Sequence, residues 1–477
     1  MEQEQTCVTH TPFGRIRGLQ RDGISVFKGI RYATAERFRS PTLVTDWDGE
    51  IDATTYTAQA PQLFGLLEKA LGASSIPAAE DCLSLNVFTP GCDDARRPVM
   101  VWIHGGAFTT GGGAMPWYDG SQLGRIGDIV VVTINYRLGA LGFSGRTNAG
   151  LRDQVAALEW VHRGIESFGG DPDNVTIVGE SAGGSSVIAL MAVPSAKHLF
   201  HRAFAMSPSV AQLRSGERAD EALEEYLGHV GVQSIDDLRD LPIDPLLGAQ
   251  ALILRNVSAG FTGFSPCSDG DFVPEPILAA AAANPIPLVV GTTRDEMNLF
   301  SAFNPHMGGL SDADALDHFG RVFGEGASVA LDLYRRARPG ATNGQLVSAL
   351  QTDQIFRIPA QRLAEARVRE SLPTWMYWFT WATPAFGGIL GSCHAVDIPF
   401  AFHNLARPGV DQFTGSGPER AAVADVYSDA LLGLVRDGTV PWPEYDLESR
   451  PTMRVDVDSE LLQDPERDVR ELWAAAT

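Results

Sequence analysis

The stretch Val175-Thr176-Ile177-Val178-Gly179-Glu180-Ser181-Ala182-Gly183 determines the fold that we expect for this chain. Its four β-branched residues predict a buried strand, and the Ala-, Ser- and Leu-containing segment 182–191 predicts a helix that ends near Pro194. The Gly-x-Ser-x-Gly pattern between them is typical of a serine on a tight, strained turn, where small neighbours avoid clashes. Ser181 is therefore the candidate nucleophile.

Further apolar runs, each ending in a turn, occur on both sides of this stretch. Uninterrupted apolar strands of this kind favour the centre of a parallel sheet that is covered on both faces. Between them, segment 151–161 repeats its apolar residues at helical spacing. Alternating strands and helices predict an α/β fold of the α/β-hydrolase type, with a mostly parallel central sheet flanked by helices. The runs in question are 99–103, 129–134, 204–206, 287–290 and 375–381.

Two longer segments, 210–250 and 300–370, differ from this alternation. They are rich in Ala, Leu and Asp and contain few strand signals, so we expect helical insertions that form the pocket walls. No internal repeat and no Gly/Ser- or Pro-rich linker divides the chain. We therefore expect one domain over residues 1–477.

Composition narrows the classes of partner. The chain has 37 basic and 59 acidic residues and a net charge of −22, which argues against nucleic acid and anionic membranes as partners. Five scattered cysteines lack metal-ligand spacing and indicate free thiols in a reducing compartment. The first 25 residues contain no signal-peptide core, and no 18-residue apolar run occurs. We expect a cytoplasmic monomer or small homo-oligomer without metal or cofactor.

A second glycine-rich turn, His104-Gly105-Gly106-Ala107, follows the predicted strand 99–103. This is the position of the oxyanion loop that supplies backbone N–H donors to the negative charge of an acyl-transfer transition state. We expect the donors to be the N–H groups of Gly106, Ala107 and Ala182, the last of which opens the helix after Ser181. His104 itself is expected to anchor the loop.

The base and the acid of a serine triad follow the nucleophile along the chain in this fold. His394 lies in a loop after the aromatic run 375–381, where an imidazole can reach the serine. His403 lies among phenylalanines and is expected to be a packed or capping residue. The turn after 287–290 offers two adjacent carboxylates, Asp295 and Glu296, and spacing alone does not choose between them.

Several blocks of the chain resemble the type-B carboxylesterase family, which includes bacterial p-nitrobenzyl esterases and the cholinesterases. The resemblance implies Glu296 as the acid and supports His394 as the base. It also implies that Ser207 is a serine next to the triad, and that Arg37–Glu80 and Arg137–Asp153 are structural ion pairs. The blocks are 27–33, 80–87, 135–139, 168–172, 179–183, 353–359 and 442–445.

The resemblance also has gaps. The segment between Tyr32 and Arg37 is shorter than is usual in the family, which leaves the rim of the pocket and the substrate open. Cys82 stands at a position that forms a disulfide in secreted members, yet no cysteine upstream and nearby can pair with it, which favours a bacterial, intracellular enzyme. The choline site of the cholinesterases cannot be transferred to this chain.

These features together predict a serine carboxylesterase that hydrolyses small-molecule esters through a Ser181–His394–Glu296 triad and an acyl-enzyme. A wide Gly-Gly-Ala loop leaves room for bulky, including tertiary, alcohols. The alternatives are a non-catalytic binding protein of the neuroligin kind, and an amidase, thioesterase or detoxifying hydrolase with the same triad. Six aromatic residues are candidates for the pocket lining: Phe108, Trp117, Tyr118, Phe300, Trp378 and Phe379.

Overall fold

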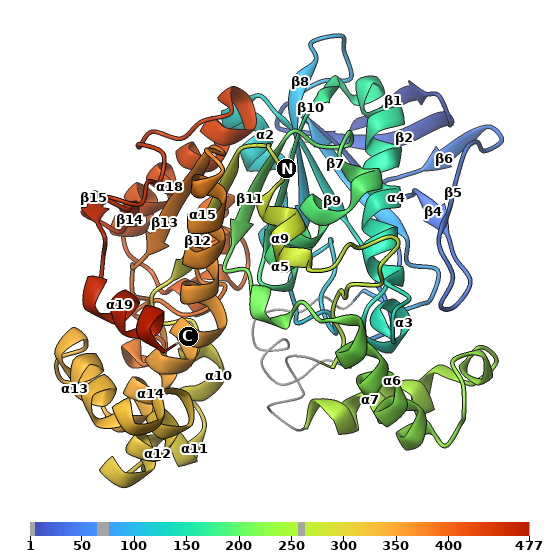
Figure 1. Ribbon diagram of the computed structural model, residues 1–477. Helices are drawn as coiled ribbons and strands as arrows, with labels where there is room; N and C mark the ends of the chain where they lie inside the picture. Colours follow the sequence, from blue (N-terminus) through green and yellow to red (C-terminus); the bar gives the residue numbers. More distant parts are fainter. Residues whose placement is uncertain (1–4, 64–75, 256–262, 477) are drawn as a thin grey trace.

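The computed structural model describes residues 5–63, 76–255 and 263–476. A thirteen-stranded sheet runs through the molecule in the order β1-β2-β3-β7-β9-β8-β10-β11-β12-β13-β14-β15, with β6 paired to β2 (Figure 1). The strands of this sheet are β1 Gln5–Thr11, β2 Gly14–Arg21, β3 Ile24–Arg31, β6 Glu50–Asp52, β7 Ser84–Thr89, β8 Arg97–Ile103, β9 Val130–Ile134, β10 Gly170–Glu180, β11 Arg202–Met206, β12 Leu288–Thr293, β13 Thr374–Phe379, β14 Pro451–Val455 and β15 Glu460–Gln463. A two-stranded ribbon pairs β4 Ala33–Thr34 with β5 Thr42–Leu43.

The centre of the sheet is parallel. Each neighbouring pair from β9 through β8, β10, β11, β12 and β13 to β14 is parallel, whereas β1, β2, β3 and β7 on one side and β15 on the other pair antiparallel. The five apolar runs that the sequence indicated as strands overlap β8, β9, β11, β12 and β13, with ends that differ by at most two residues where a run extends past its strand. This architecture confirms the predicted α/β-hydrolase fold with a mostly parallel central sheet.

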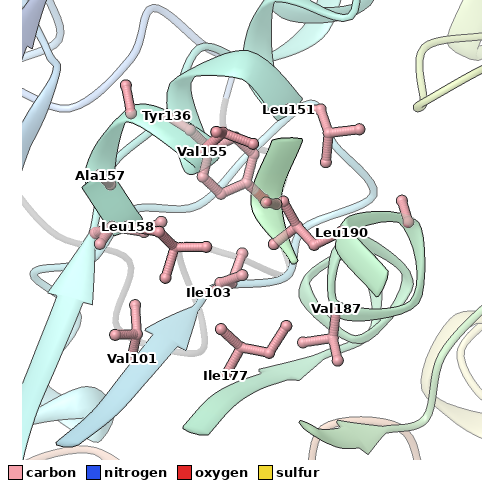
Figure 2. Close-up of a cluster of buried hydrophobic side chains, with 14 of the residues drawn as sticks. Val101, Ile103, Tyr136, Leu151, Val155, Ala157, Leu158, Ile177, Val187 and Leu190 are labelled. Carbon is pink, nitrogen blue, oxygen red and sulfur yellow. The ribbon is translucent and has the colours of Figure 1, made fainter. Parts of the chain in front are cut away.

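Helices cover both faces of the sheet, because successive side chains of a strand point to opposite faces. In β8, Val101 and Ile103 belong to one core cluster, while Trp102 between them belongs to the other. Figure 2 shows the first cluster, where Val101, Ile103 and Ile177 of the sheet meet side chains such as Val155 of α4 and Val187 of α5. The helices are α2 Ser121–Gly127, α3 Gly139–Phe143, α4 Ala149–Gly164, α5 Ala182–Ala192, α6 Gly216–Val230, α7 Ile243–Leu254, α9 Ile277–Ala282, α10 Asn298–Ser301, α11 Pro305–Gly308, α12 Asp312–Phe323, α13 Ala327–Ala337, α14 Asn343–Thr352, α15 Ile358–Arg369, α16 Ile398–Ala401, α17 Val410–Thr414, α18 Glu419–Asp437 and α19 Arg467–Ala475.

The two predicted insertions are helical: α6–α7 and α11–α14 lie at the same end of the molecule, on opposite sides of it (Figure 1). The last part of the second predicted insertion is different, because α15 packs against β12 and β13 of the central sheet. Helices α12, α13 and α14 form a third apolar cluster with Val469 and Trp473 of α19. Gln212, Phe300 and Phe356 of these segments line a cavity beside Ser181, so the predicted insertions supply part of its wall.

The two expected ion pairs are present. Arg137 and Asp153 are buried and make a two-pronged contact, with Nη2–Oδ1 and Nε–Oδ2 distances of 2.6 and 2.7 Å. Arg37 and Glu80 pair at 2.5 Å, closer to the surface. All five cysteines are unpaired. Over the described ranges, none of the helices combines the length and the apolar composition that a membrane crossing requires.

Candidate active site

Ser181 occupies the turn between β10 and α5, with φ 59° and ψ −120°. The neighbouring glycines leave no room for a side chain. A Cβ on Gly179 would lie 2.5 Å from the carbonyl carbon of Gly183, and a Cβ on Gly183 would lie 1.9 Å from the Ile103 oxygen. The turn is therefore strained and requires small neighbours, as the motif predicted.

A continuous chain of contacts joins Ser181 to His394 and Glu296. The Ser181 Oγ lies 2.8 Å from His394 Nε2, and His394 Nδ1 lies 2.5 Å from Glu296 Oε2. The other carboxylate oxygen of Glu296 accepts a hydrogen bond from the Thr293 N–H at 2.8 Å. All three side chains project from turns that follow β10, β12 and β13, whose carboxyl ends lie at the same edge of the sheet.

The two competing candidates point elsewhere. Asp295 joins two loops, because its N–H donates to the Ser392 carbonyl at 2.8 Å and its Oδ2 accepts from the Ser392 N–H at 3.0 Å. His403 pairs with Asp425 at 2.7 Å on another part of the molecule. The geometry thus brings Glu296, and not Asp295, to the imidazole of His394.

The expected oxyanion donors lie around the same cavity. Gly106 and Ala107 line it and have φ values of 110° and 52°, and Ala182 is the first residue of α5. In the described part of the chain, the N–H groups of Gly106, Ala107 and Ala182 donate to no backbone carbonyl. The first N–H groups of a helix have no partner inside the helix, which leaves that of Ala182 available to a ligand.

His104 fixes this loop. Its ring stacks on that of Tyr136, with centroids 4.5 Å apart, and its Nδ1 lies 2.8 Å from the Gly105 oxygen. Burial lowers the pKa of His104 to about 4, so the imidazole is neutral near pH 7. These contacts match the anchoring role expected of it.

The cavity beside Ser181 has a volume of about 200 Å³. Of the six aromatic candidates, Trp117, Tyr118 and Phe300 line it. The sequence did not indicate Phe356, Met115, Leu299 and Ile398, which complete the apolar wall. Phe356 lies in block 353–359, so the resemblance could have signalled it.

The other three aromatic candidates do not line this cavity, which corrects the expectation for them. Phe108 is fully buried against Phe143, with ring centroids 4.9 Å apart. Phe379 packs into the core beneath α16 and α18. Trp378 points to the opposite face of β13, where the guanidinium of Arg357 lies 4.2 Å from its ring centroid. Alternation along β13 separates Trp378 from Phe379, and neither faces Ser181.

Ser207 follows β11 and is fully buried, with φ 44°. Its N–H donates to the Gly291 carbonyl, while the neighbouring Met206 carbonyl accepts from the Ser181 N–H. Within the described parts of the chain, its Oγ finds no hydrogen-bond partner. Ser207 thus lies directly behind the Ser181 turn, which is the position the resemblance implied.

Two further buried carboxyl groups lie at the site and were missed by the sequence analysis. Glu180 Oε1 lies 3.2 Å from His394 Nε2, and Asp397 Oδ2 accepts from the Tyr427 hydroxyl at 3.0 Å. Burial raises the pKa of both carboxyls. Burial opposes a charge on His394 as well, but the carboxylates of Glu180 and Glu296 outweigh it and raise the pKa of His394.

The model of the carboxylesterase family matches residues 5–460. The chain belongs to the carboxylesterase family. It is accordingly a carboxylic-ester hydrolase on the α/β-hydrolase fold. Among known proteins it is 36% identical to the para-nitrobenzyl esterase of Bacillus subtilis, over 97% of this chain and 98% of that protein. It is also 34% identical to the phenmedipham hydrolase of Pseudarthrobacter oxydans, over 94% of this chain and 93% of that protein.

Solved structures agree with this assignment. A Geobacillus stearothermophilus carboxylesterase superposes with a TM-score of 0.86 at 36% sequence identity, and the match covers 98% of this chain and 99% of the other. A structure described as a thermophilic PNB esterase superposes with a TM-score of 0.85 at 34% identity and the same coverage. Both likenesses extend over nearly the whole chain.

Proposed function

We propose that this carboxylesterase hydrolyses small-molecule esters by two-step acyl transfer through Ser181, His394 and Glu296. The observation that carries the proposal is the continuous contact from Ser181 Oγ through both ring nitrogens of His394 to the buried carboxylate of Glu296. A neutral imidazole with its proton on Nδ1 accepts the Ser181 proton at Nε2. Glu296 holds that tautomer and stabilises the imidazolium that forms.

In the first step, Ser181 Oγ attacks the ester carbonyl while its proton passes to His394 Nε2. The N–H groups of Gly106, Ala107 and Ala182 donate to the oxyanion, and losing one such donor typically costs about 3 kcal/mol of transition-state stabilisation. The imidazolium then protonates the alkoxide, which leaves as the alcohol. In the second step, His394 takes a proton from water and the hydroxide attacks the acyl carbonyl. The acyl–Oγ bond then breaks, the acid leaves, and the imidazolium returns its proton to Ser181 Oγ.

The apolar lining of the cavity favours, as substrates, esters that carry a compact apolar or aromatic group near the scissile bond. The cavity is lined by the aromatic residues Trp117, Tyr118 and Phe356 and by the aliphatic side chains of Met115 and Ile398. The name of the Bacillus subtilis relative, para-nitrobenzyl esterase, fits this chemistry. A binding protein without catalysis is disfavoured, because the serine, imidazole and carboxylate are all in contact.

We propose that residues 1–477 form one domain, supported by the central sheet, whose strands run from β1 to β15. We propose a bacterial, cytoplasmic enzyme; relatives such as that of Bacillus subtilis support the bacterial source, and five unpaired cysteines support the reducing compartment.

The test is the hydrolysis of p-nitrophenyl acetate and butyrate by the wild type and by Ser181→Ala. We expect kcat to fall by at least about 10⁴-fold in the variant, since catalysis by a triad depends on its nucleophile. Ser195→Ala, at an exposed serine shortly after α5, is the matched control and should retain wild-type rates. Unchanged turnover in Ser181→Ala would exclude the mechanism.

A further inference from the structure

Four large exposed apolar side chains lie on the two loops that carry Glu296 and His394, and one of them, Phe300, lines the cavity. We name Phe300, Phe303, Phe386 and Ile389 the aromatic apron; they are 42%, 58%, 53% and 44% exposed, respectively. Scattered exposed apolar residues are ordinary, whereas a contiguous group next to a binding cavity calls for an explanation.

The apron is continuous with the cavity. Phe300 lines the cavity, and its ring centroid lies 5.4 Å from that of His394. Phe303 follows three residues later, and Ala302 between them keeps helical dihedral angles, which places both phenylalanines on one side of the turn. Phe303 in turn packs edge-to-face on Phe386, with centroids 5.4 Å apart and an interplanar angle of 78°.

The two loops are joined to each other, so the apron keeps a fixed position relative to the triad. Asp295 and Ser392 exchange two hydrogen bonds, and the Asn298 side-chain amide donates to the Leu390 carbonyl at 3.2 Å. On one loop these contacts are made by the residue before Glu296 and by Asn298, which lies between Glu296 and Phe300; on the other they are made by Leu390 and Ser392, which lie between Ile389 and His394. An apolar group on the apron is therefore held at a defined distance from Ser181.

Phe386 adopts a left-handed backbone conformation while its side chain stays half exposed. Its φ and ψ are 52° and 33°, and the following Gly387 and Gly388 also have positive φ. The left-handed conformation costs a residue with a Cβ roughly 1–2 kcal/mol. Because the Phe386 side chain stays half exposed, its burial contributes only part of the hydrophobic free energy that a fully buried phenylalanine would give. The stability of the fold alone therefore does not account for a phenylalanine at this position.

The size of the apron indicates a small occupant. At roughly 200 Å² for each aromatic side chain, the four exposed fractions amount to roughly 400 Å² of apolar surface. A stable dimer buries about 800 Å² on each partner, twice that value. The cavity of about 200 Å³ is smaller than the usual pocket for a drug-sized ligand, at roughly 300–1,000 Å³. A larger ester must therefore project out of the cavity.

We propose that the aromatic apron binds the distal apolar part of an ester, an aryl group or a long alkyl chain, while the scissile bond lies at Ser181. The inference rests on the proposed function of Ser181 and adds the class of substrate: esters longer than the cavity, with an apolar end remote from the carbonyl. Phe300 guides that end from the cavity onto Phe303 and Phe386. The apron thereby selects substrates through binding and takes no part in the chemical steps.

The experiment compares the wild type with the double variant Phe303→Ser/Phe386→Asn, in which Asn tolerates the left-handed conformation. Two ester pairs are used below their micelle concentrations: p-nitrophenyl decanoate against butyrate, and biphenyl-4-yl butyrate against phenyl butyrate. We expect the long-to-short ratio of kcat/KM to fall about tenfold, mainly through KM, in the pair whose distal group reaches the apron; loss of two aromatic contacts is of this order. Val329→Ser, at a 66% exposed apolar residue of α13, is the control and should keep the wild-type ratio.

Unchanged ratios for both pairs, in a double variant with a wild-type melting temperature, would overturn the proposal. So would a wild-type dimer in sedimentation velocity that the double variant dissociates, because the occupant would then be a second copy. An advantage of long esters that arises only above their micelle concentration would also overturn it, since the apron would then bind an aggregate. If the wild type and Ser181→Ala hydrolyse the short esters equally, the proposed function fails instead.

Discussion

Glu180→Gln tests the electrostatics of the site most directly. The Glu180 carboxyl is buried and lies 3.2 Å from the same Nε2 that accepts the Ser181 proton. A carboxylate there stabilises the imidazolium form of His394, yet catalysis requires the neutral imidazole at the start of the reaction. Removing the charge destabilises the imidazolium, so the pKa of His394 falls. The acid limb of the pH profile of kcat/KM then moves to lower pH.

The size of the shift follows from the geometry. Two unit charges 3.2 Å apart interact by about 5 kcal/mol at an effective dielectric constant of about 20. That value is an upper limit, because burial raises the pKa of Glu180 and reduces the fraction that is ionised. A nearby opposite charge commonly changes a pKa by about 1–3 units. We expect the acid limb to move down by about 1–2 units, and the plateau rate to fall because His394 becomes a weaker base.

The assay is pH-stat titration of acid released from a short ester between about pH 4.5 and 9.5, chosen to bracket the ordinary pKa values of Glu and His. Glu221→Gln, at an exposed glutamate of α6, is the matched control and should leave the limb in place. An acid limb of Glu180→Gln that stays fixed, or moves to higher pH, would refute the reasoning. Circular dichroism on the same samples excludes unfolding as the cause.

Two further predictions concern the acid of the triad and the stability of the fold. Glu296→Gln should lower kcat by about 10⁴-fold, because the imidazole loses the partner that holds its tautomer, whereas Asp295→Asn should cost far less in the same ester assay. A larger loss at Asp295 would contradict the assignment. Asp153→Asn should destabilise the protein by about 3–5 kcal/mol, since it leaves the Arg137 guanidinium buried with a neutral partner. Urea denaturation measures this change, and a loss below about 1 kcal/mol would contradict it.

The local features of this chain were predictable because they depend on neighbours in sequence. The β-branched run before Ser181 lies within β10, and the small residues after it begin α5, since strand and helix preferences act over a few residues. The glycines at 179 and 183 are required by backbone atoms within the same turn or on the adjacent strand. The order of serine, acid and histidine along the chain likewise follows from the order of the strands.

Side-chain direction, in contrast, was decided by tertiary structure. Asp295 and Glu296 are adjacent carboxylates, yet one joins two loops and the other reaches His394, because the turn after β12 directs them apart. Phe300 and Trp378 are both aromatic, yet only Phe300 faces the cavity. The 3.2 Å contact between Glu180 and His394 joins residues more than two hundred positions apart. Sequence fixes which groups are available at each turn; packing of the whole sheet fixes which of them meet, because a side chain's direction depends on backbone torsions that distant contacts hold in place.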